Sequence, residues 1–129
     1  MPFSSAEYAR EYYYKNREKL LERNRQWCRD HPEVKRAQQE RYRKRIRAEV
    51  IAAYGGACAC CGADYPSHLT IDHINGGGSA ERKKHSSSYA LERRLRREGF
   101  PPGYQVLCWN CNWAKHREGA CGCQGRWAL

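Results

Sequence analysis

Hydrophobic positions over the first 54 residues are interspersed with charged ones. Between residues 1 and 54, single apolar residues recur among charged ones at the spacing typical of a helix, which predicts a helical arm. The apolar stripe is too thin to form a core by itself. The arm is therefore expected either to lie along a nucleic acid or to pair with a second copy in a homodimer. Gly55 and Gly56 are expected to end it.

Capping and breaking residues divide this arm into predicted segments. Ser4 and Glu7 have the spacing of a capping box, which predicts the first helix start. Asn16 is expected to restart the helix after a kink. Asp30 is expected to cap a further helix that has Pro32 in its first turn.

Residues 55–129 show the mixed pattern of a small α+β domain. Residues 68–72 are β-branched and alternating, as in a strand, and residues 104–107 are its expected partner. A helix is predicted from about residue 87 to residue 98, where glycine and prolines follow. A short last helix is expected through residues 114–116.

Composition and charge favour an anionic polymer as the partner. The 129 residues are 40% hydrophobic and carry a formal net charge of +10. Basic side chains release condensed counterions when they approach phosphates, although other basic proteins share this charge. The chain has no apolar run long enough to cross a bilayer. It also shows no apolar signal core at its start, so a cytoplasmic location with reduced thiols is expected.

Two Cys-x-x-Cys knuckles predict a structural zinc site. The first consists of Cys58 and Cys61, and the second of Cys108 and Cys111. Four thiolates in two such pairs can complete a tetrahedral zinc site, and the long separation leaves room for a catalytic hairpin between the knuckles.

Three other cysteines leave alternatives open. Cys60 offers a second way to chelate with Cys58, although a two-residue gap is the commoner knuckle. Cys121 and Cys123 are interpreted as free thiols in preference to ligands of a further metal.

Asp72, His73 and Asn112 are the candidate catalytic residues. A histidine at the end of a strand can take a proton from water, and Asp72 can bind a hard cation such as Mg²⁺ or Mn²⁺. Asn112 offers a neutral oxygen to the same cation. Taken singly, Asp72 also fits a cap, His73 a packed ring and Asn112 the N-cap of the last helix. Together with the knuckles they favour hydrolysis of a phosphodiester.

These motifs resemble those of the HNH endonucleases, in particular the small stand-alone forms common in phages and mobile introns. The resemblance covers about residues 51–121. It implies a ββα-metal (His-Me finger) core, braced here by zinc, in which a hairpin and a helix hold one catalytic divalent ion. It also implies that His73 is the general base and that Asp72 is a metal ligand. The matching segments, with x for unmatched positions, are Cys58-Ala-Cys-Cys-Gly62, Leu69-x-Ile71-Asp72-His73-Ile74-x-Gly76-Gly77 and Gln105-Val106-Leu107-Cys108-x-Asn110-Cys111-Asn112-x-x-Lys115.

The sequence departs from the family pattern at two places. The family's last histidine, a metal ligand, is replaced by Asn112, as in the HNN variants. The middle asparagine has no counterpart, so its role in orienting His73 is expected to pass to a main-chain carbonyl near Gly103. His116, one turn after Asn112, is a spare candidate ligand for the catalytic ion.

Basic residues near these motifs are candidate DNA contacts. The alternative is that they only form a solvent-exposed face of a helix. They lie in the loop before the predicted 87–98 helix, on that helix, and in the arm. They are Arg82, Lys83, Lys84, Arg93, Arg94, Arg97, Arg43, Lys44 and Arg47.

The sequence thus predicts a metal-dependent endonuclease acting on double-stranded DNA, with a single Mg²⁺ or Mn²⁺ ion and a structural Zn²⁺. Two alternatives remain open. One is a non-catalytic, zinc-braced module that binds nucleic acid, and the other is an enzyme that cleaves branched DNA or RNA.

Overall fold

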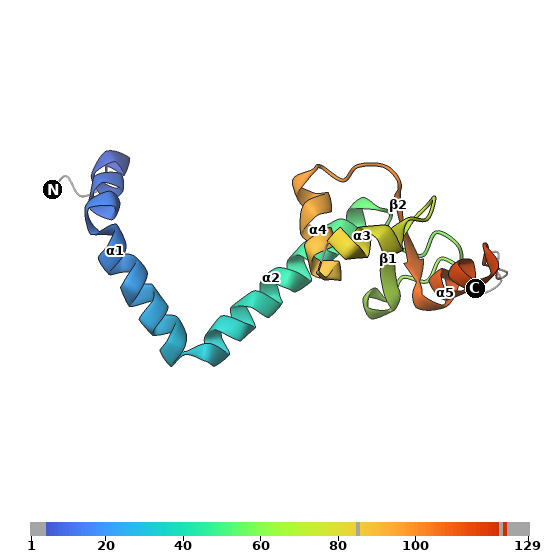
Figure 1. Cartoon of the computed structure of the whole chain (residues 1–129), viewed down its shortest axis with the longest axis horizontal. Helices are drawn as coiled ribbons and strands as arrows, with labels where there is room; N and C mark the ends of the chain where they lie inside the picture. The colour runs from blue at the N-terminus through green and yellow to red at the C-terminus, as the bar shows by residue number, and fades with distance from the viewer. Residues whose placement is uncertain (1–4, 85, 122, 124–129) are drawn as a thin grey trace. The chain divides into compact units, whose positions relative to one another are not determined.

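The computed structural model describes residues 5–84, 86–121 and 123. The chain divides into two compact units, Met1–Arg41 and Tyr42–Leu129. No helix in the described part of the chain is long and apolar enough to cross a membrane. The elements in chain order are α1 Ala6–Asp30, α2 Pro32–Ala53, the 3-10 turn η1 Pro66–His68, β1 Leu69–His73, α3 Gly78–Lys84, α4 Ser88–Arg97, β2 Tyr104–Cys108 and α5 Trp109–Glu118 (Figure 1).

Helix α1 is continuous and none of its residues is buried. Its N-cap is Ser5, whose hydroxyl accepts a hydrogen bond from the Tyr8 amide. Ser4, the expected cap, lies outside the described residues. The expected kink at Asn16 is absent, because α1 contains no proline or glycine and the Asn16 amide donates to the Tyr12 carbonyl one turn earlier.

The break between the first two helices falls where the proline predicts it. Helix α1 ends at Asp30 and α2 begins at Pro32. Proline disfavours the helical conformation of the residue before it, here His31. Asp30 is the last residue of α1, where it accepts a hydrogen bond from Gln26, and it does not cap α2 as expected.

The second unit begins inside α2, earlier than the expected boundary after residue 54. Ile46 and Val50 of α2 are fully buried and form a cluster with Leu95 of α4. Two helices that bury the same side chains cannot belong to separate folding units. The final turns of α2 are therefore part of the domain that carries the candidate site.

The two predicted strands form an antiparallel pair, which confirms the α+β class. Leu69 lies opposite Cys108 at one end, and His73 lies opposite Tyr104 at the other. Since successive side chains of a strand point to opposite faces, Asp72 and Gln105 share one face while His73 and Tyr104 share the other. Ile71 and Tyr104 pack against the α2–α4 cluster, and α5 packs against both strands.

Two segments differ from the prediction, and one agrees. The basic stretch expected to be a loop is the helix α3, which follows Gly76 and Gly77 at φ +75° and +91°. The last helix begins at Trp109 with Cys108 as its N-cap, so Asn112 lies within the helix and not at its cap. The predicted helix at 87–98 is confirmed as α4, with Ser87 as its N-cap.

Candidate functional site

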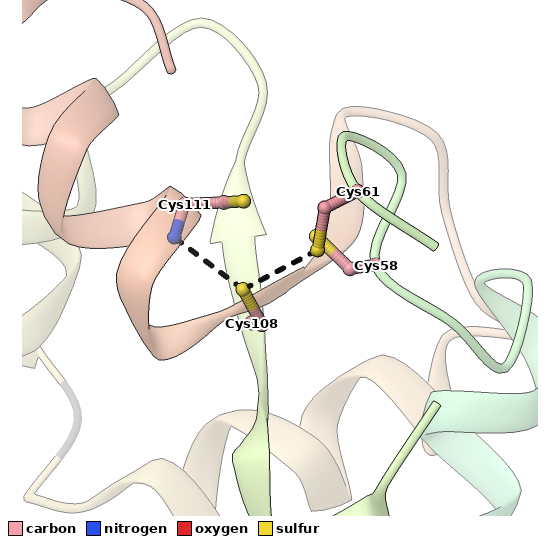
Figure 2. A group of neighbouring side chains, drawn as sticks. All are labelled: Cys58, Cys61, Cys108 and Cys111. Carbon is pink, nitrogen blue, oxygen red and sulfur yellow. Dashed lines mark hydrogen bonds between the residues drawn. The ribbon is translucent and has the colours of Figure 1, made fainter. Parts of the chain in front are cut away.

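Four cysteines from three parts of the second unit meet in the core. Cys58 and Cys61 lie in the segment after α2, Cys108 ends β2, and Cys111 lies in the first turn of α5. All four are buried, and their sulfurs lie within 4.8 Å of one another. Figure 2 shows the Cys108 sulfur between the sulfur of Cys61 and the backbone nitrogen of Cys111.

The geometry of this group is suitable for a metal ion. Two thiolates at about 2.3 Å from a tetrahedral zinc lie about 3.8 Å apart, and the sulfurs of Cys61 and Cys108 are 3.7 Å apart. Burial alone raises the pKa of the Cys58 thiol, but backbone hydrogen bonds at Cys61, Cys108 and Cys60 outweigh burial and lower this pKa to about 7. Burial and neighbouring thiols raise the pKa of Cys111. The spacing of the four sulfurs is what allows the group to hold a structural metal such as zinc.

His73 lies at the end of β1 with one ring nitrogen engaged. Its Nε2 contacts the Glu81 carboxylate of α3, and its ring centroid is 4.9 Å from that of Tyr104. A side chain at position 78 would place its Cβ 3.2 Å from the His73 Nδ1 atom. Glycine at position 78 therefore lets the start of α3 lie close to the His73 ring.

Glu81 is held in turn by two side chains. Its Oε1 accepts hydrogen bonds from the Tyr104 hydroxyl, at 3.1 Å, and from the Arg94 guanidinium of α4. Arg94 also donates to the Tyr104 oxygen at 2.6 Å. Burial first, and then the hydrogen bond to Glu81, raise the pKa of Tyr104, so its hydroxyl stays protonated and able to donate. The Glu81 side chain is only 14% exposed.

Sequence reasoning missed Glu81 because its segment was taken for a basic loop. The available signal was that Glu81 is the single acid between Gly78 and Lys84, immediately before three basic residues. A helix in that segment brings Glu81 back toward the end of β1. The main-chain carbonyl of Gly103, expected to orient His73, instead accepts the Ile74 amide at 3.0 Å.

Asp72 faces the opposite side of the hairpin and is paired with a cation of the chain. Its Oδ2 accepts hydrogen bonds from the Lys115 ammonium at 2.5 Å and from the Gln105 amide at 2.8 Å. The same ammonium donates to the carbonyls of His73, at 2.7 Å, and Ile74, at 3.1 Å. Three oxygens at this end of the hairpin thus surround a positive charge.

Asn112 and His116 are placed differently on α5. Asn112 is half-buried and precedes Lys115 by three positions, so the two share one side of the helix. Within the described residues, no hydrogen bond joins Asn112 to Asp72 or His73. His116 is exposed, with its ring centroid 6.4 Å from that of Trp113, and it shows no contact with Asp72 in that part of the chain.

Most of the basic residues selected from the sequence lie on the surface. The guanidinium groups of Arg43 and Arg93 lie over the Tyr89 ring, at 5.1 and 5.7 Å from its centroid. This stacking keeps both cations at the surface while restricting their motion. The exposed members are Arg43, Lys44, Arg82, Lys83, Lys84, Arg93 and Arg97.

Arg47 and Arg94 are engaged inside the unit. Arg47 donates to the Glu92 carboxylate at 2.8 Å and also to the Leu69 carbonyl, and Glu92 is only 5% exposed. Arg94 contacts Glu81 and Tyr104, as described above. The structure therefore gives these two guanidinium groups roles in packing and positioning, in contrast to the expected DNA contacts.

A cavity of about 450 Å³ opens between α2 and α4. Several guanidinium-bearing residues line it, and Arg96 among them pairs with Glu49 at 2.5 Å. Because Arg94 belongs both to this lining and to the Glu81 contact, the basic groove and the His73 site share a residue. The lining residues are Tyr42, Ile46, Ala90, Arg93, Arg94, Arg96 and Arg97.

No protein-family model, curated protein or solved structure matches the chain.

Proposed function

We propose that this protein is a metal-dependent endonuclease, of the HNH kind, that hydrolyses phosphodiester bonds in double-stranded DNA. One observation carries the proposal. The His73 ring is held through Nε2 by Glu81, while Nδ1 forms no hydrogen bond with the residues that the structure describes.

The contact with Glu81 determines which nitrogen of His73 acts as the base. A carboxylate accepts hydrogen bonds only, so Nε2 must carry the proton that it donates to Glu81. In the neutral ring Nδ1 then has the free lone pair and can take a proton from a water molecule. Tyr104 and Arg94 hold Glu81 in place, which in turn fixes the ring.

The opposite face of the hairpin supplies the ligands for a divalent cation. Asp72 and Asn112 offer a carboxylate and an amide oxygen, the hard donors that Mg²⁺ and Mn²⁺ prefer. The Lys115 ammonium now lies among three oxygens at this end of the hairpin, so a divalent ion bound by Asp72 competes with it. When bound, a divalent ion there supplies positive charge to the scissile phosphate and the leaving oxygen.

The two ends of the hairpin have separate tasks in this proposal. Leu69 and Cys108 form its metal-braced end, and His73 and Tyr104 form its reactive end. Zinc bound by the four buried cysteines keeps α5 against the strands, and α5 carries both Asn112 and Lys115. The chain order of β1, β2 and α5 agrees with the ββα-metal arrangement that the motifs imply.

Charge supports DNA as the substrate. The chain has a formal net charge of +10, and exposed basic side chains lie on α2, α3 and α4. An arginine-lined groove beside the His73 site can bind phosphates of the same strand that is cut. A single site of this kind cuts one strand, so nicking is the expected activity of one copy.

A second candidate function is a non-catalytic module that binds nucleic acid. The ion pair of Lys115 with Asp72 favours it, because this pair satisfies the carboxylate without a divalent ion. Both candidates predict DNA binding, and only the first predicts cleavage.

The test uses supercoiled plasmid with Mg²⁺, Mn²⁺ or EDTA. We expect the wild type to convert plasmid to open circles only with a divalent ion. Asp72→Ala is expected to lose this activity while binding DNA as before, and Asn75→Ala, on the exposed loop after β1, serves as the control. DNA binding without cleavage in either metal would favour the non-catalytic module.

A panel of duplex, four-way junction and RNA substrates then ranks the nucleic acids, and a preference for junctions or RNA would overturn the choice of plain duplex DNA.

A further inference from the structure

A second group of cysteines lies against the first one. Cys60, Cys111, Cys121 and Cys123 have sulfurs within 4.8 Å of one another. The Cys123 sulfur is 3.0 Å from those of Cys60 and Cys121 and 3.4 Å from that of Cys111. These distances are shorter than the about 3.8 Å between two thiolates on one zinc, so the sulfurs must move apart when an ion binds. Cys111 belongs to both groups, so its sulfur stands between the two sets of ligands.

The fold brings these residues together from distant parts of the sequence. Cys60 lies inside the first knuckle, between two residues of the buried group. Helix α5 ends at Gly119, whose left-handed conformation, at φ +79°, lets the chain leave the helix toward Cys121 and Cys123. Cys60, Cys121 and Cys123 are half-buried and pack against the core that contains Cys58 and Cys61.

The surroundings leave access for an ion. A cavity of about 250 Å³ adjoins the group, and Cys60, Cys111, Cys121 and Lys115 are among its lining residues. Four sulfurs complete a tetrahedral coordination shell, and a thiolate has enough lone pairs to bridge two metal ions.

We propose that Cys60, Cys121 and Cys123 bind a second zinc ion, which shares the Cys111 thiolate with the first. Seven of the eight cysteines then form one two-metal cluster, and Cys28 in α1 stays outside it. The second ion ties the segment after α5 to the first knuckle, so both ends of α5 are fixed by metal. The proposal goes beyond the endonuclease assignment and stands whether or not the protein cuts DNA.

Metal stoichiometry tests the proposal directly. The full chain, purified under reducing conditions, is measured by native mass spectrometry and by elemental analysis for zinc. Two zinc ions per chain are expected in the wild type and in the control Cys28→Ser. One ion is expected in Cys60→Ser and in the double variant Cys121→Ser/Cys123→Ser, which both leave the first four ligands intact. One ion in the wild type, or an unchanged count in the variants, would overturn the second site.

The shared sulfur has its own signature. With ¹¹³Cd in place of zinc, two resonances that split each other are expected, because a bridging thiolate couples the two nuclei. Two unsplit resonances would overturn the sharing of Cys111. A wild-type chain lighter by two hydrogens and holding one zinc would identify a disulfide among Cys60, Cys121 and Cys123 and would contradict the proposal.

Discussion

Asp72 and His73 are adjacent in the chain, yet the two faces of the hairpin give them different surroundings. His73 is on the face covered by α3 and α4, where an acid contacts its ring. Asp72 is on the face covered by α5, where a lysine and an amide contact its carboxylate. A strand separates neighbouring side chains onto opposite faces, and each face has acquired a partner of complementary charge.

The two faces also differ in what holds them together. The His73 side packs on a small apolar cluster of Ile46, Val50 and Leu95, with the Arg47–Glu92 pair beside it. The α5 side contains the four buried cysteines, which form half of the buried residues of its core cluster. One face therefore depends on packing and a charge pair, and the other contains cysteines that can hold a metal ion. This difference gives each face its own test.

Loss of metal is expected to have the largest effect. The binding free energy of structural zinc sites is about 10–16 kcal/mol, and it is available to the protein only in the folded state. We therefore expect Cys58→Ser, or chelation of the wild type, to abolish the cooperative thermal transition of the second unit in circular dichroism. Cys28→Ser, outside both groups, should melt like the wild type. A chelated protein that keeps its transition would show that packing alone supports the α5 face.

Glu81→Leu, which removes both acceptor oxygens, tests the His73 face. Removing a partner that orients a functional histidine costs about 10–100-fold in activity, and we expect a loss of this size in the rate of plasmid nicking. The loss should appear in kcat with KM nearly unchanged, because Glu81 acts on the His73 ring and not on the DNA. The ¹⁵N shifts of the ring should also move away from the Nε2–H tautomer. Unchanged shifts together with a slow rate would assign Glu81 a different role.

Glu92→Ala tests the packing of the same face. It removes the partner of Arg47, and hydrogen bonds to charged groups contribute about 1.5–3 kcal/mol. We expect a loss of this size in the free energy of unfolding by urea, while Glu98→Ala, an exposed control on the C-cap of α4, should change little. A loss below about 0.5 kcal/mol, the range of ordinary surface substitutions, would contradict this account.

The pH dependence of the same residue provides a second readout. Burial raises the pKa of Glu92 above its ordinary value of 4.5, against the opposing effect of Arg47. The folded state therefore binds this proton more tightly than the unfolded state. The resulting stability is present below pH 4.5 and is lost as the pH rises through the folded-state pKa. Glu92→Gln should remove this contribution to the dependence of the free energy of unfolding on pH. An identical pH dependence in the wild type and the variant would contradict the assignment.

Lys115→Met is expected to give the smallest effect and addresses the α5 face. In the variant, Gln105 is the only remaining hydrogen-bond donor described above for the Asp72 side chain, which is 13% exposed. We expect this to lower the free energy of unfolding by about 1–3 kcal/mol. If Asp72 binds the divalent ion, Mn²⁺ should restore part of the melting temperature in the variant and raise it less in the wild type, where Lys115 competes. Lys83→Met on α3 is the control. Equal responses to Mn²⁺ in all three proteins would argue against Asp72 as a ligand.

The sequence predicted the elements of the fold that depend on short-range patterns of residues. Both strands and α4 appear within about one residue of their predicted bounds, since alternation and capping are short-range signals. The four cysteines of the first group meet as their spacing predicts. Pro32 and Gly55 mark the ends of helices because each restricts or frees the backbone at a single position.

The contacts that could not be predicted join segments far apart in the chain. The charge of Arg47 and Arg94 suggested the surface, but only the tertiary fold places Glu92 and Glu81 within reach of them. The same reason hid Lys115, whose partner Asp72 is 43 positions away. Cys60, Cys121 and Cys123 looked like spare thiols, because nothing in their local sequence shows that the chain returns to the first knuckle after α5.

The central claim is that His73 is the general base for cleavage of DNA. The most direct test compares plasmid nicking by the wild type and by His73→Ala in Mg²⁺ and Mn²⁺, with free imidazole added to the variant. A positioned base contributes about 10²–10⁴-fold, so we predict a loss of that size at unchanged DNA affinity and zinc content, and partial recovery with imidazole. A folded His73→Ala variant that nicks plasmid at the wild-type rate would contradict the claim.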